Sequence, residues 1–155
     1  CRALRITICA VGRARNSPTF EICQTYLQRL PWTVDIREVE VRKNLTGEKL
    51  TLAEAESLRA VMPARGTLIA LDGKGTALSS EAFAMYLAGW QDGGIADVIF
   101  AIGGANGLHP DLSRAAELTL SLSAMTWPHL LARAMLAEQL YRAHTILTGH
   151  PYHRA

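Results

Sequence analysis

Two glycine-rich segments have the composition of turns that let a backbone approach a small ligand closely. Residues 103–107 read GGANG and residues 72–75 read DGKG, and each follows a short apolar run. Glycine lacks the Cβ that would block such an approach, so the neighbouring backbone amides stay accessible to a bound molecule. With residues 121–127 as a third segment, the two turns predict a site for one small ligand that seeks amide groups.

Neither glycine segment is specific by itself. Residues 103–107 do not form G-x-G-x-x-G, no acidic residue stands about 20 positions later, and no G-K-[ST] of a phosphate-binding loop follows. An ordinary turn between a strand and a helix is an equally good interpretation. Asp72 also has a simpler role, because Asp beside Gly most often closes a turn.

Aromatic and basic side chains gather in the C-terminal segment. They are Tyr141, Arg142, His144, Tyr152, His153 and Arg154. These residue types can stack on a nucleic-acid base and neutralise phosphates. The alternative is an amphipathic helix whose Tyr141 belongs to the core and whose Arg142 is solvated. The residues alone leave both interpretations open.

Other chemistry has little support in the sequence. His150 and His153 are three positions apart, but no Cys or His cluster with zinc-site spacing supplies further ligands, so we expect no metal. Ser123 lies in no G-x-S-x-G elbow, and none of the three cysteines is in a recognisable catalytic setting. The net charge of +2 is too small to indicate a nucleic-acid binder by itself.

Length and composition predict one domain over residues 1–155. With 49% hydrophobic residues, the chain can fill a single substantial core. The cysteines Cys1, Cys9 and Cys23 form no C-x-x-C pair, which is typical of a reducing compartment. We find no long apolar stretch of a signal peptide and no segment near the ~20 apolar residues that span a bilayer. We therefore expect a cytoplasmic protein.

Strands and helices alternate in the pattern that must position these segments. Apolar runs predict strands at residues 5–11, 33–41, 67–71, 98–102 and 118–122. Helical patterns cover residues 19–30, 52–61, 128–147 and a segment from Ser79 or Ser80 to Gln91. Pro128 and Gly149 bound the last helix. This order predicts an α/β fold with a mostly parallel sheet, helices on both faces, and ligands beyond the carboxyl ends of the strands.

Longer stretches of the sequence resemble the RlmH family of SPOUT methyltransferases. Residues 120–129 (LSLSAMTWPH), 138–143 (EQLYRA) and 149–153 (GHPYH) are similar to the signature of that family. Residues 100–108 (FAIGGANGL) and 71–75 (LDGKG) also resemble it in order and spacing. The resemblance extends from residue 10 to the end of the chain, and between residues 13 and 64 it holds in outline.

The resemblance implies a SPOUT, or α/β-knot, fold whose C-terminal segment forms a trefoil knot that holds the cofactor. Periodicity alone would predict an unknotted doubly wound sheet. The family also implies a homodimer in which both chains contribute to the substrate site. The implied cofactor is S-adenosylmethionine, held mainly by backbone groups at Leu71, Gly103, Leu122, Ser123, Ala124, Met125, Thr126 and Trp127.

The reaction that the resemblance implies is methylation of N3 of a pseudouridine in 23S ribosomal RNA. It is an in-line displacement that needs no metal, so positioning supplies much of the rate. The implied substrate is a hairpin loop within the assembled ribosome, and free RNA should be a poor substrate. Two other classes remain as alternatives: a non-catalytic ribosome-associated factor with a retained cofactor pocket, and a small-molecule nucleotide-binding enzyme.

The N3 proton must leave during this reaction, which calls for a base or for a group that stabilises the deprotonated ring. We hypothesise that His153, Tyr152 and Arg142 act in this step. The candidate substrate-binding residues are His129, Arg133 and Arg154, with the first two near the cofactor end of the site.

Overall fold

A parallel sheet forms the centre of the computed structural model, which describes residues 4–14, 17–41, 44–104, 107–123, 125 and 128–154. Within these residues the sheet has five strands in the order β2-β1-β4-β3-β5, and every paired strand is parallel. The strands are β1 (Arg5–Val11), β2 (Thr33–Val39), β3 (Thr67–Ala77), β4 (Asp97–Ile102) and β5 (Leu118–Ser121). The predicted α/β class and parallel sheet are confirmed.

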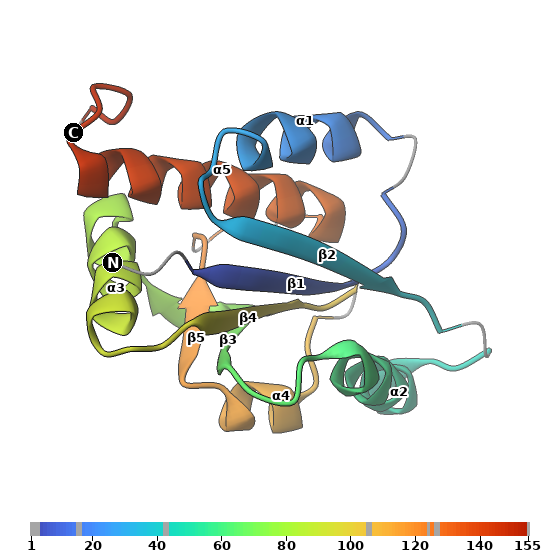
Figure 1. Cartoon of the computed structure of the whole chain (residues 1–155). Coiled ribbons are helices and arrows are strands. Elements are labelled where there is room, and N and C mark those ends of the chain that lie inside the picture. Colours follow the sequence, from blue (N-terminus) through green and yellow to red (C-terminus); the bar gives the residue numbers. More distant parts are fainter. Residues whose placement is uncertain are drawn as a thin grey trace.

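Helices cover both faces of the sheet (Figure 1). One face carries α1 (Pro18–Leu27), α3 (Ser80–Asp92) and α5 (His129–Thr148), and the other carries α2 (Gly47–Val61) and α4 (Pro110–Ala115). Helix α1 packs on α5 through Cys23, Ala134 and Ala137. None of the helices in the described ranges has both the length and the apolar character needed to cross a membrane.

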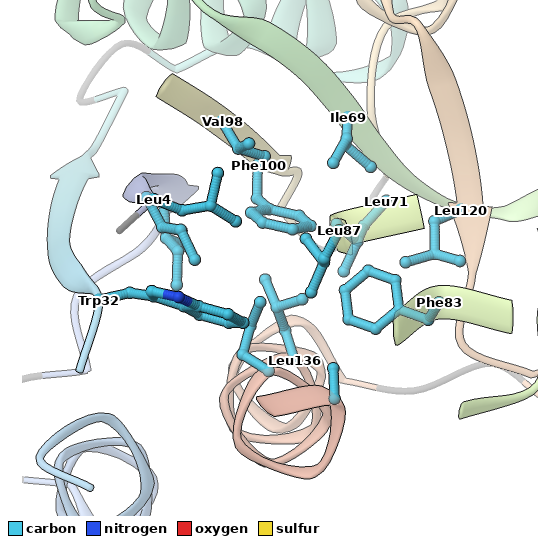
Figure 2. Close-up of a cluster of buried hydrophobic side chains, with 14 of the residues drawn as sticks. Leu4, Trp32, Ile69, Leu71, Phe83, Leu87, Val98, Phe100, Leu120 and Leu136 are labelled. Carbon is cyan, nitrogen blue, oxygen red and sulfur yellow. The ribbon is translucent and has the colours of Figure 1, made fainter. Parts of the chain in front are cut away.

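The larger of the cores lies between the sheet and helices α3 and α5 (Figure 2). Phe100 of β4 meets Phe83 of α3 edge-on, with ring centroids 6.2 Å apart. Alternate residues of the same strands face the other core, where Cys9 and Ala101 pack with Leu58 of α2. Because both faces are covered, residues 98–102 are all buried and read as one apolar run.

Helix α5 begins and ends close to the predicted positions. Pro128 is its N-cap residue, and Gly149 follows its last turn in the left-handed conformation, with φ at 73°. The backbone N–H of His150 donates to the carbonyl oxygen of Thr145, which closes the helix end (2.9 Å). At α3, where the sequence left Ser79 and Ser80 open as the helix start, the cap is Ser79, whose hydroxyl accepts from the N–H of Ala82.

Several predicted boundaries were wrong, for local physical reasons. The first helix ends at Leu27 and not at residue 30. Residue 30 precedes Pro31, and a proline disfavours a helical conformation in the residue before it. Strand β2 ends at Val39, because its partner β1 ends at Val11 opposite it. Helix α2 begins at Gly47 and not near residue 52. Its first turn is polar and exposed, so it lacks the apolar pattern from which the helix was predicted. Helix α4 was not predicted, because six residues are too few for a helical period.

Strand β3 also differs from the prediction, because it does not end before residues 72–75. It continues to Ala77 through an irregularity at which Leu120 of β5 pairs with both Leu71 and Thr76. In the extra residues, the N–H of Lys74 donates to Asp72 Oδ1 at 3.0 Å. The DGKG segment is therefore a bulge inside a strand and not a turn between a strand and a helix.

The trefoil knot implied by the family resemblance stays a prediction. Ala124, Thr126 and Trp127, in the segment between β5 and α5, lie outside the described residues.

Candidate functional site

The carboxyl ends of four strands lie in one row across the sheet. Ala10 of β1 pairs with Ile102 of β4, Ile102 pairs with Leu71 of β3, and Leu71 pairs with Leu120 of β5. The segments that follow these residues therefore come together at one edge, although up to 110 positions separate them in the sequence. This is the edge at which parallel sheets bind ligands.

A cavity of about 340 Å³ opens at this edge. Its volume lies at the lower end of the range of small-ligand sites. Segments 71–74 and 102–104 contribute to its wall, and His129 and Ala132 of α5 close one side. The segment after β5 contributes Leu120, Leu122, Ser123 and Met125. Of the predicted cofactor residues, Leu71, Gly103, Leu122, Ser123 and Met125 line it. The other three, Ala124, Thr126 and Trp127, lie outside the described residues.

Glycine forms one wall of this cavity because a side chain does not fit there. A Cβ on Gly103 would lie 2.5 Å from the carbonyl carbon and oxygen of Gly107. The turn is closed by the N–H of Gly107, which donates to the carbonyl oxygen of Gly104 at 3.0 Å. The wall is thus backbone, which suits a flat ligand whose edge forms hydrogen bonds with amides.

The segment after β5 is shaped by its serines. Ser121 Oγ donates to the carbonyl oxygen of Ser123 at 2.8 Å, and the N–H of Met125 donates to Ser123 Oγ at 2.8 Å. Such side-chain bonds hold an irregular backbone in one shape. Met125 lines the cavity and is 70% exposed, so its apolar side chain lies at the mouth.

His129 lies at the α5 side of the cavity. Its Nε2 atom is 2.9 Å from the point that a Cβ on Gly12 would occupy, so the imidazole and the end of β1 are in close contact. Burial, together with the charge of Arg133, lowers the pKa of His129 below its ordinary value. The imidazole is therefore neutral at neutral pH and can accept a hydrogen bond.

Arg133, one turn further along α5, points to a different place. It is 2% exposed, and its guanidinium contacts Glu38 of β2 and the carbonyl oxygen of Gly12. Burial opposes ionisation of Glu38, but hydrogen bonds from Ala14 and Arg133 outweigh it and lower the pKa of this carboxyl. Arg133 lines a second cavity, of about 440 Å³, between α1 and β2. The structure thus separates its guanidinium from the cavity at the strand ends.

The predicted catalytic residues meet in a tail cluster of Glu81, Glu138, Arg142, Tyr152 and His153. Arg142 Nη2 lies 2.7 Å from Glu138 Oε1, which also accepts from the Tyr152 hydroxyl at 3.1 Å. Arg142 Nη1 is 3.1 Å from His153 Nδ1, and its guanidinium lies over the Tyr152 ring, 4.9 Å from the centroid. Arg154, the next residue, is exposed.

The hydrogen bonds of the tail cluster fix the protonation of two of its members. An arginine can only donate, so His153 Nδ1 accepts and Nε2 carries the hydrogen that Glu81 Oε1 accepts at 2.8 Å. Burial and hydrogen bonds to Tyr26 and Glu138 raise the pKa of Tyr152, which keeps the phenol protonated. Within one chain, neither side chain has a free acceptor for the N3 proton.

The cavity and the tail cluster are well separated along α5. His129 begins this helix, and Arg142 lies thirteen residues further on. At 1.5 Å per residue, the two positions are about 20 Å apart along the helix axis. One bound nucleotide cannot contact both in a single chain.

A family model described as "Predicted SPOUT methyltransferase" matches residues 4–153. The chain belongs to the SPOUT methyltransferase family. This SPOUT chain is 50% identical to a protein of Rhodospirillum centenum and 47% identical to one of Paramagnetospirillum magneticum. Each alignment covers at least 97% of the chain and 99% of the relative, and both relatives are named ribosomal RNA large subunit methyltransferase H. The predicted RlmH family is confirmed.

The fold of the SPOUT chain also matches a solved structure of low sequence identity. The probable methylase family protein of Haemophilus influenzae aligns with a TM-score of 0.55 at 10% identity. The alignment covers 98% of this chain and 70% of the other. At this identity the likeness concerns the fold alone.

The SPOUT structure adds four carboxyl groups that we did not identify in the sequence: Glu38, Glu54, Glu81 and Glu138. Only Glu138 had a local signal, because it stands four residues before Arg142 on the same helix. The other three meet Arg133, Gly104 and His153 respectively, which lie 50 or more positions away in the sequence. In the described ranges, no three His, Cys, Asp or Glu side chains are grouped as a metal site would require.

Proposed function

We propose that this chain uses S-adenosylmethionine to methylate N3 of a pseudouridine in large-subunit ribosomal RNA. The proposal rests on one observation: the backbone-walled cavity at the strand ends, in a chain similar over its whole length to the methyltransferases H. The substrate is the RNA of an assembled ribosome, which implies a cytoplasmic site of action. Leu71, Gly103, Leu122, Ser123 and Met125 would hold the cofactor, together with Ala124, Thr126 and Trp127.

The residues of this chain fit that cofactor. Gly103 lets the turn fold tightly against Gly107, so that the cavity wall is backbone, and Leu71 and Leu122 offer apolar surface for the faces of a flat ligand. S-adenosylmethionine supplies a methyl group carried on a sulfonium. The neutral imidazole of His129 borders the space where the base must enter and can hold the target base by accepting a hydrogen bond.

The tail cluster is suited to the other side of the reaction. The Arg142 guanidinium can stabilise the negative charge of a pseudouridine that has lost its N3 proton. The aromatic ring of Tyr152, held edge-to-face against Tyr141 with centroids 4.8 Å apart, can orient the base. His153 accepts the proton on Nδ1 once an arriving substrate displaces Arg142 from that atom.

Two chains are needed to assemble this site. Because about 20 Å of α5 separates His129 from Arg142, the tail of one chain must reach the cavity of a second copy. The proposed homodimer also accounts for apolar side chains exposed on α1 and α5: Phe20, Ile22 and Leu131. A symmetric pair would then contain two composite sites.

The test is transfer of radiolabelled methyl from S-adenosylmethionine to purified bacterial ribosomes that lack the modification, followed by mass mapping of the RNA. We expect label at N3 of one pseudouridine, with much less on free RNA. His153→Ala should lose turnover while it keeps its affinity for cofactor and ribosomes. His150→Asn removes an exposed neighbouring imidazole but keeps an acceptor for the N–H of Tyr152, and it serves as the matched control.

Two results would overturn this proposal. Cofactor binding without transfer to intact ribosomes would indicate a non-catalytic ribosome-associated factor. Full turnover of His153→Ala with normal ribosome affinity would remove this histidine from the mechanism.

A further inference from the structure

Glu54 is a buried carboxyl group behind the glycine wall of the cavity. It belongs to α2, on the face of the sheet opposite α5, and is 7% exposed. Its Oε2 atom lies 2.7 Å from the point that a Cβ on Gly104 would occupy. Gly104 itself lines the cavity. The Glu54 carboxyl therefore packs directly against a residue of the cavity wall.

This carboxyl group is not fully paired. Its Oε1 atom finds no hydrogen-bond donor in the described part of the chain. Burial raises the pKa of Glu54 above its ordinary value, and no other cause contributes. A buried carboxylate without a partner is costly, so a group of this kind indicates a cation or donor that arrives from outside.

In the ranges that the structure describes, the neighbouring elements supply no partner for Oε1. Strand β1 faces Glu54 with Val11 and, deeper in the same apolar cluster, the thiol of Cys9, and β2 contributes Val39. Other titratable groups on this face of the sheet stand at the start of α2 and of α4. There Glu48 lies 3.6 Å from His109 Nε2, and His109 Nδ1 accepts from the N–H of Asp111. Both are engaged with each other or with the backbone.

We propose that Glu54 is the counter-charge for a positive group of the molecule bound in the cavity, and so selects cationic ligands over neutral ligands of similar shape. The inference rests on the proposed use of S-adenosylmethionine, which carries two cations, an ammonium and a sulfonium. Gly104 allows the carboxyl group to lie this close to the cavity wall, because a side chain at this position would have to displace it.

The experiment measures binding by calorimetry for wild type and Glu54→Gln, which keeps the shape and removes the charge. The three ligands are S-adenosylmethionine, S-adenosylhomocysteine, which lacks the sulfonium, and 5′-methylthioadenosine, which lacks both cations. We expect Glu54→Gln to weaken S-adenosylmethionine about tenfold and to leave 5′-methylthioadenosine within about twofold. Glu56→Gln, at an exposed position of the same helix, is the matched control and should bind like wild type.

S-adenosylhomocysteine identifies the cation. Equal weakening of this ligand assigns Glu54 to the ammonium, and unchanged binding assigns it to the sulfonium. Equal loss for all three ligands, or no loss for any, would overturn the proposal. If wild type binds 5′-methylthioadenosine but not S-adenosylmethionine, the proposed cofactor is wrong. This outcome differs from the outcomes that contradict only the role of Glu54.

A second measurement uses wild type alone and does not depend on the folding of the variant. Binding of a cation beside Glu54 should lower the pKa of this carboxyl and release protons. Calorimetry at about pH 6, in buffers of different ionisation enthalpy, should detect proton release with S-adenosylmethionine and none with 5′-methylthioadenosine. Equal proton release with both ligands would contradict the inference.

Discussion

Arg133 of α5 and Glu38 of β2, 95 positions apart in the sequence, form an ion pair that ties this helix to the edge strand. Arg133 Nη1 lies 2.5 Å from Glu38 Oε2, and Nη2 donates to the carbonyl oxygen of Gly12 at 3.1 Å. Gly12 directly follows β1 and contacts His129. The pair therefore holds the first turn of α5, and one side of the cavity, against the end of β1.

Removal of this pair should destabilise the fold. Arg133→Met fills much of the same volume but leaves Glu38 without its buried partner, which should cost about 3 kcal/mol in the free energy of unfolding. Denaturation in urea measures this. Arg13→Met breaks a pair with Glu40 whose side chains are 65% and 47% exposed, and it should cost less than about 1 kcal/mol. Similar losses in the two variants would contradict a structural role for the buried pair.

A side chain on the glycine wall should weaken ligand binding. Gly103→Ala places a methyl group 2.5 Å from the backbone of Gly107, so the turn must shift and affinity for S-adenosylmethionine should fall at least about tenfold. Calorimetric titration measures the loss. Gly89→Ala is the matched control, because a Cβ there has no neighbour within 4 Å. It should bind normally and gain about 0.5–1 kcal/mol, since Gly89 lies inside α3.

Stability should fall as the pH drops below about 6.5, partly because of two histidines. Burial lowers the pKa of His129 and of His144, with further contributions from Arg133 and His150 respectively. Between the unfolded and the native pKa, the unfolded chain binds protons at these two histidines and the native protein does not. The stabilising effect is present above the unfolded pKa and is lost as the pH falls toward the native one.

The matching measurement compares unfolding free energies at about pH 7.5 and about pH 5 for wild type, His129→Asn and His144→Asn. Each variant should lose less stability on acidification than wild type. Burial raises the pKa of Glu54, so this group makes the protein more stable as the pH falls. Because Glu54 is present in all three proteins, the difference between them isolates the effect of each histidine. An equal loss in all three proteins would contradict the assignment.

Two inactive variants should restore activity when they are mixed. If the site combines the cavity of one chain with the tail of the other, a dimer of Gly103→Ala with His153→Ala contains one intact site. Random exchange of chains should then give about a quarter of the wild-type methylation rate. Chains refolded together and assayed on ribosomes provide the measurement, and each variant refolded alone is the control. Activity no higher than that of the parents would indicate that each chain carries its own complete site.

Much of the local structure could be predicted from the sequence. All five strands were found, because buried parallel strands are short apolar runs between turn residues. The long helix α5 was bounded within about a residue, because Pro128 and Gly149 act through steric preferences of their own backbone. The bulge at residues 72–75 was mistaken for a turn, since only pairing with β5 keeps that segment in the sheet.

The sequence by itself determined the elements, the glycine wall and, through family resemblance, the kind of protein. These depend on side-chain periodicity, on glycine sterics and on contiguous motifs, all of which are local in the chain. Only the tertiary structure decided which charged groups meet: Arg133 with Glu38, His153 with Glu81, and Glu54 with the back of Gly104. The order of strands and the packing of helices bring these distant positions together, and no local pattern encodes that order.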